Sequence, residues 1–170
     1  MYQKFKTHLD KYQFYGFTIL AALLTLALIV WILELFTVGT GAEFLKANGI
    51  DVNNLKEEGN KTTKIMTSFV LSYIGNSLII IFFVIYVWLA ARKIKVGYCF
   101  FIIWTVLFIA LASMPFIHGS AGQHPIQLAI GIIIAILSSL ISVGLIASTV
   151  KYYRDKQLHK YEWIKIHKGK

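Results

Sequence analysis

The sequence predicts an all-α fold, an integral membrane four-helix bundle with the N-terminus and the C-terminus in the cytoplasm. Three observations support this prediction. Of the 170 residues, 57% are hydrophobic, four long apolar runs contain a single charged residue, and the basic residues gather on one side of those runs. Soluble domains are about 45–50% apolar even when glycine is counted, so a soluble enzyme is excluded.

Each apolar run is long enough to cross a hydrocarbon core of about 30 Å, which takes about 20 helical residues. Lipid offers the backbone no hydrogen-bond partner, so each run must form a helix. The first run is longer than the apolar part of a signal peptide, about 7–15 residues, and we expect it to be retained. The predicted spans, within a single membrane domain of residues 1–170, are 14–38, 66–91, 96–117 and 126–150.

The distribution of Lys and Arg predicts the orientation, because these residues are retained on the cytoplasmic side of a membrane. Thirteen of the 17 lie in the tail 1–13, in the turn 92–95 and in the tail 151–170. The other four lie in the loop 39–65, where four acidic residues balance them, and the loop 118–125 has none. Both tails are therefore expected in the cytoplasm. Lys outnumbers Arg by 15 to 2, which favours an AT-rich bacterial genome and thus a multi-pass protein of the bacterial cell membrane.

The two tails and the long loop are the segments expected outside the bilayer. In the tail 1–13, apolar side chains recur on one side of a helix and Lys4 and Lys11 on the other, which predicts an amphipathic helix on the inner leaflet. Alternatively, this tail is simply the cytoplasmic start of the first span. The loop 39–65 is longer than a connector requires, and it either caps the bundle or contacts something outside the membrane.

The tail 151–170 contains seven cations interleaved with aromatic residues. Each cation close to an anionic leaflet is worth about 1 kcal/mol, so we expect this tail to bind anionic lipids. Docking on a partner protein is the alternative. We expect no nucleic-acid partner, because the tail has no recognised nucleic-acid-binding motif.

Small and polar residues lie on one face of the second and of the fourth span. Helices in lipid associate by close packing of small residues and by interhelical hydrogen bonds. The two faces are therefore predicted to form the contact at the centre of the bundle or a contact with another subunit, and the lining of a polar pathway is the alternative. The residues concerned are Ser68, Ser72, Gly75 and Asn76 in the second span and Gln127, Gly131, Ser138 and Ser142 in the fourth.

Glu34 is the only acidic residue within a span, which makes it a candidate proton or ligand site. It lies four residues from the end of its span, close enough to reach the outer interface. His118 and His124 flank the short outer loop, and together with Glu34 they are candidate ligands of a divalent metal. Because their spacing matches no compact metal motif, we expect no metal site.

The chain lacks the residues that a membrane enzyme would need. No Asp and no His pair lies within a span, and the sequence has no CxxC, HExxH or Gly-rich nucleotide loop. We therefore expect no catalytic residues and no cofactor. The predicted function is that of a non-catalytic accessory or binding subunit of a membrane complex, of the transport, secretion or immunity type. The alternatives are a small transporter or channel acting as a homo-oligomer and a metal-dependent membrane enzyme.

Overall fold

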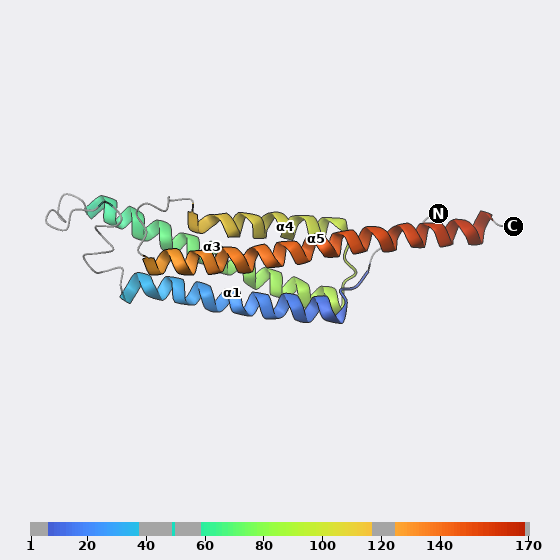
Figure 1. Cartoon of the computed structure of the whole chain (residues 1–170), viewed down its shortest axis with the longest axis horizontal. Coiled ribbons are helices and arrows are strands. Elements are labelled where there is room, and N and C mark those ends of the chain that lie inside the picture. The colour runs from blue at the N-terminus through green and yellow to red at the C-terminus, as the bar shows by residue number, and fades with distance from the viewer. Residues whose placement is uncertain (1–6, 38–48, 50–58, 117–124, 169–170) are drawn as a thin grey trace.

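The protein is a bundle of four long helices (Figure 1). The computed structural model describes residues 7–37, 49, 59–116 and 125–168. Within these ranges each of the four helices is long and apolar enough to span a membrane, which confirms that part of the prediction. The helices are α1 (Lys11–Thr37), α3 (Gly59–Arg92), α4 (Tyr98–Ser113) and α5 (Pro125–Lys168), and a 3-10 turn, η2 (Met114–Phe116), follows α4.

Three helices extend beyond the predicted spans. α1 begins three residues before residue 14, α3 begins seven residues before residue 66, and α5 continues eighteen residues beyond residue 150. The predicted limits mark where the apolar side chains end, whereas a helix ends only where its backbone hydrogen bonds are interrupted. Residues 151–168 contain neither Pro nor Gly. No helix-breaking residue therefore ends α5 where the apolar run ends.

Prolines determine where α4 ends and where α5 begins, at the end of the bundle opposite the extension of α5. The α-helical part of α4 ends at Ser113, two residues before Pro115, and continues as the tighter turn η2. α5 begins at Pro125. Proline has no backbone N–H and fixes its φ angle, so it interrupts a helix from within but is well tolerated in the first turn.

The four helices run alternately up and down, and α5 packs along both α4 and α1 (Figure 1). α1 also packs along α3, while α3 meets α4 over a short stretch. Buried residues recur at alternating intervals of four and three, the repeat of a left-handed bundle. They include Phe17, Ala21, Leu24, Leu28 and Trp31 in α1, Ile80, Phe83, Val87 and Ala90 in α3, Phe101, Trp104, Phe108 and Leu111 in α4, and Ile134, Ser138, Ile141 and Leu145 in α5.

An aromatic cluster of Phe17, Phe83, Trp104 and Phe108 fills the centre of the bundle. Phe83 is 0% exposed. Its ring centroid lies 5.8 Å from that of Phe17, 5.1 Å from that of Trp104 and 4.7 Å from that of Phe108, each pair in an edge-to-face arrangement. Such pairs are stabilised beyond the area they bury. These rings come from α1, α3 and α4, so they join three helices at this level and fill the interior of the bundle.

Candidate functional site

Four of the predicted contact residues are buried in the bundle: Asn76, which is 5% exposed, Ser138, which is 0% exposed, Ser142 and Gly131. The other described members of the set differ. Ser68 and Ser72 are half-buried, and Gly75 is exposed. Gly131 is buried against η2, where a Cβ atom would lie 3.0 Å from Cβ of Pro115.

Asn76 and Ser138 lie at nearly the same level of the interior. Phe17 packs against Phe83 of α3, and its Cε1 would lie 3.0 Å from a Cβ atom at Gly144 of α5. α3 and α5 run in the same direction (Figure 1). Asn76 is seven residues before Phe83 and Ser138 six before Gly144, which places them about 10 Å and 9 Å above that level.

These two residues form what we call the polar layer. Oγ of Ser138 is buried and has no hydrogen-bond partner among the described residues, and the Asn76 side chain is 5% exposed. Ser142, by contrast, donates its hydroxyl to the carbonyl of Ser138 at 3.0 Å. A buried hydroxyl without a hydrogen bond costs about 1–3 kcal/mol, so Ser138 makes the polar layer a locally unfavourable feature of the core.

The remaining predicted residues lie outside what the structure describes. The backbone of Glu34 belongs to α1 and that of Gln127 to α5, but their side chains are not described. His118 and His124 fall in the undescribed range 117–124. Among the residues that are described, no group of three or more His, Cys, Asp or Glu side chains is arranged to hold a metal ion.

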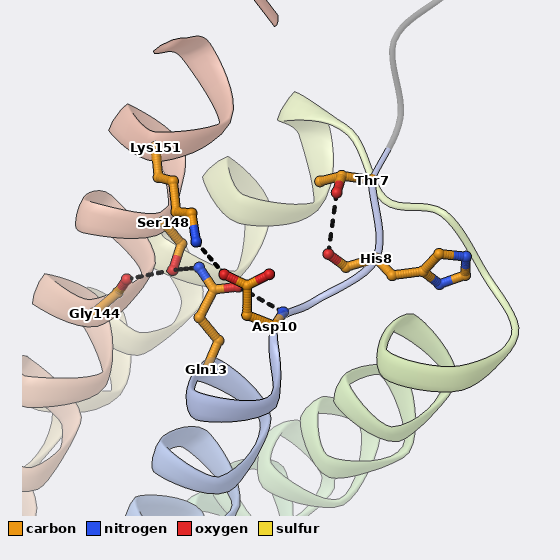
Figure 2. Close-up of polar contacts among 7 residues, drawn as sticks. All are labelled: Thr7, His8, Asp10, Gln13, Gly144, Ser148 and Lys151. Atoms are coloured by element: carbon orange, nitrogen blue, oxygen red, sulfur yellow. Dashed lines mark hydrogen bonds and ion pairs between the residues drawn. The ribbon is translucent and has the colours of Figure 1, made fainter. Parts of the chain in front are cut away.

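The structure adds a feature that the sequence did not predict, an extended strap formed by residues Thr7–Asp10 (Figure 2). Thr7 and Val96 form an antiparallel bridge: the Thr7 N–H donates to the Val96 carbonyl at 3.1 Å, and the Val96 N–H donates to the Thr7 carbonyl at 2.7 Å. The Leu9 N–H donates to the carbonyl of Ala90 at 3.1 Å, and the Leu9 side chain is buried.

The prediction of an amphipathic helix over the tail 1–13 is therefore wrong for residues 7–10, which are not helical. The last carbonyls of a helix have no intrahelical partner, and Ala90 lies in the last turn of α3. In the turn after α3, the backbone N–H and carbonyl of Val96 are also available to pair with a neighbouring strand. Pairing with these groups satisfies the backbone of the strap, and burial of Leu9 favours the extended form over a surface helix.

A chain of polar contacts joins the strap to α1 and α5 (Figure 2). The Asp10 N–H donates to Oε1 of Gln13 at 3.0 Å, Nε2 of Gln13 donates to Oγ of Ser148 at 2.9 Å, and this hydroxyl donates to the carbonyl of Gly144 at 2.8 Å. The carboxylate of Asp10 forms an ion pair with Lys151. The bond from the Asp10 N–H to the Gln13 side chain is one half of a capping box at the start of α1.

A groove of about 440 Å³ lies between α1 and α5 beside this chain of contacts. We call it the α1–α5 groove. Its walls are polar at the end of the bundle and apolar further in. It is within the range of volumes typical of small-molecule sites, about 300–1,000 Å³. The lining residues are Asp10, Tyr12, Gln13, Ser148 and Lys151 at the polar end and Gly16, Phe17, Leu20, Gly144 and Ala147 at the apolar end.

The architecture defines the class: with four described helices long and apolar enough to span a membrane, the chain has the architecture of a multi-pass membrane protein. No family model, no curated protein and no solved structure matches it.

Proposed function

We propose that the protein is a non-catalytic accessory or binding subunit of a larger membrane complex, of the transport, secretion or immunity type. The observation that supports this most directly is the form of α5. Beyond the end of the bundle α5 continues as one straight helix, well past the ends of α1 and α4 (Figure 1). We call this part, residues 153–168, the projection.

The projection combines basic side chains with exposed apolar ones. Its cations include Lys156, Lys160 and Lys165, and its exposed apolar side chains include Leu158 and Ile166. Apolar groups exposed among charges are typical of the anchors of a protein interface. A helix that continues straight out of a bundle presents such anchors to a partner in the adjoining solvent.

Distance limits how much of the projection a membrane surface can attract. Lys151 lies at the end of the bundle, where it pairs with Asp10 of the strap. Lys160 and Lys165 follow nine and fourteen residues later, about 14 Å and 21 Å along the helix axis, and the usual tilt of about 20° shortens this little. Charges are largely screened beyond about 8 Å at physiological ionic strength. The proposed binding of anionic lipids is therefore concentrated at Arg154 and Lys156, which follow Lys151 within about 8 Å along the axis, and the proposed protein partner binds the outer projection.

A second candidate function is a small transporter or channel acting as a homo-oligomer. The polar layer of Asn76 and Ser138 favours it, because intramembrane polar side chains often mark a pathway. The aromatic cluster opposes a pathway through a single copy, since Phe83 and its neighbours fill the interior about 10 Å from the polar layer. A pathway would thus have to run between copies, and we rank the accessory function first.

The partner can be tested by substituting the exposed anchors of the projection. In mild detergent from its native membrane, the wild-type protein is expected to purify with a stoichiometric partner. Leu158→Ser combined with Tyr161→Ser is expected to reduce the recovered partner about tenfold or more, because interface anchors contribute about 2 kcal/mol or more each. The measurement is quantitative mass spectrometry together with the mass of the particle.

Tyr12→Ser is the matched control, because Tyr12 is also highly exposed but lies on α1. It is expected to leave the partner in place. A particle that contains this chain alone would contradict the accessory function and move the homo-oligomeric transporter to first place. Equal recovery of a partner by the wild type and the double variant would show that the projection is not part of the interface.

The proposed orientation, with both termini in the cytoplasm of a bacterial cell, has a test in the single thiol. Cys99 is free and exposed at the start of α4, at the same end of the bundle as the strap. In intact cells it is expected to resist a membrane-impermeant maleimide and to react once the cells are permeabilised. Asn60 is exposed at the start of α3, at the opposite end, so Asn60→Cys in a Cys99→Ser background is expected to react from outside. The reverse pattern would invert the orientation.

A further inference from the structure

We propose that the α1–α5 groove binds one phospholipid with a zwitterionic headgroup that contains a primary ammonium, as in an ethanolamine phosphoglyceride. The acyl chain lies along the apolar part of the groove, and the headgroup lies at the polar end. This site is independent of the accessory function proposed above, since it concerns a different surface from the projection.

The apolar part of the groove is open and narrow enough for a hydrocarbon chain. At Gly16 a Cβ atom would meet no other atom within 4 Å, so the wall here is bare backbone facing open space. Phe17 and Leu20 continue the wall along α1, and Ala147 faces them from α5. Small residues on one helix and larger apolar ones on the other leave a furrow that a flexible chain can fill without moving either helix.

The length and polarity of the groove match one leaflet. From Asp10 to Leu20 the wall follows ten residues of chain, about 15 Å of helix. This is half of a hydrocarbon core about 30 Å thick. The charged residues lie at the end of the bundle, at the level of the headgroups, and the apolar residues lie within the hydrocarbon region. An occupant of the whole groove must therefore be polar at one end and apolar over the length of an acyl chain.

The ion pair at the polar end complements a zwitterion. The side chains of Asp10 and Lys151 pair with each other but are each about half exposed. An ammonium has three donors and a carboxylate about four acceptor sites, so both groups retain capacity for a ligand. A lipid phosphate accepts from the Lys151 ammonium, and a lipid ammonium donates to the Asp10 carboxylate. A purely anionic headgroup would satisfy Lys151 and leave its negative charge beside Asp10.

The test fills the groove without disturbing the fold. Gly16→Leu places a side chain in the furrow where no atom stands in its way, and leucine is a better helix former than glycine. Gly75→Leu is the matched control, because Gly75 is equally unobstructed but lies on α3, outside the groove. Both variants are expected to fold, which circular dichroism verifies before binding is measured.

The measurement is native mass spectrometry of delipidated protein titrated with phosphatidylethanolamine and, separately, with phosphatidylglycerol. Wild type and Gly75→Leu are expected to take up one ethanolamine lipid more tightly than all others. Gly16→Leu is expected to weaken this step about tenfold, since excluding two methylene groups is sufficient for such a change. Asp10→Asn is expected to abolish the preference for the ethanolamine headgroup.

Two results would overturn the proposal. Equal uptake of the ethanolamine lipid by Gly16→Leu and Gly75→Leu would show only the general lipid coat of the bundle. Equal affinity of the wild type for the two headgroups would contradict the zwitterion at the ion pair. Neither result depends on whether the projection binds a partner.

Discussion

Phe83→Ala is expected to lower the free energy of unfolding by about 3–5 kcal/mol, the range for removing a large aromatic side chain from a packed core. Phe83 is fully buried and makes edge-to-face contacts with rings from α1 and α4. In lipid, little of this loss comes from the hydrophobic effect, because the hydrocarbon around the helices is as apolar as the core. The loss comes from the packing contacts of the ring and from the cavity that alanine leaves.

Phe82→Ala is the matched control for this prediction. Phe82 is the preceding residue on the same helix, has the same side chain and is 53% exposed. Its removal in detergent is expected to cost less than about 1 kcal/mol, because no cavity forms. Reversible unfolding in mixed micelles, followed by tryptophan fluorescence, measures both. Losses of similar size at the two positions would contradict the arrangement of α3 in the bundle.

Asn76→Leu is expected to raise the free energy of unfolding by about 1–3 kcal/mol, because taking an amide out of water into an apolar interior costs free energy of this order. Asn76 is 5% exposed and lies at the level of Ser138, whose Oγ has no hydrogen-bond partner among the described residues. Leucine branches at Cγ as asparagine does, is larger and has no polar atoms, so it keeps the shape of the side chain and removes the buried amide. Asn60→Leu, at the exposed start of α3, is the control and is expected to change the stability little.

The same variant separates the two candidate functions. An accessory subunit with Asn76→Leu is expected to keep its partner and gain stability. A transporter or channel whose pathway includes Asn76 is expected to gain stability and lose flux in liposomes, because a pathway residue is retained for function at the expense of stability. A loss of stability in Asn76→Leu would contradict this prediction and indicate a structural hydrogen bond of the amide.

Phe82 and Phe83 illustrate why the packing could not be predicted from composition. In a soluble helix the polar face identifies the buried face. In this chain the apolar runs are hydrophobic on all sides, because lipid takes the place of water around the helices. Two neighbouring phenylalanines can therefore differ, one exposed and the other buried. The face of small residues was a better guide within α5, where Ser138 and Ser142 are buried, than within α3, where Gly75 is exposed.

The strap and the groove depend on residues far apart in the chain. Thr7 pairs with Val96, and Gln13 contacts Ser148 across 135 positions. The spacing of Asp10 and Gln13 at the start of α1 is a local signal and was available in the sequence. The partners in the α3–α4 turn and in α5 have no local signal, because any exposed carbonyl or hydroxyl of suitable geometry would serve.

By itself, the sequence determined the number of membrane-length helices and their approximate positions. The thickness of the hydrocarbon core sets the length of an apolar run, and the need to satisfy the backbone in lipid makes each run a helix. Only the tertiary structure decided which faces meet, where the strap crosses the end of the bundle and how far α5 extends. Those features depend on side-chain shape and on backbone groups brought together by folding, and hydropathy carries no information about either.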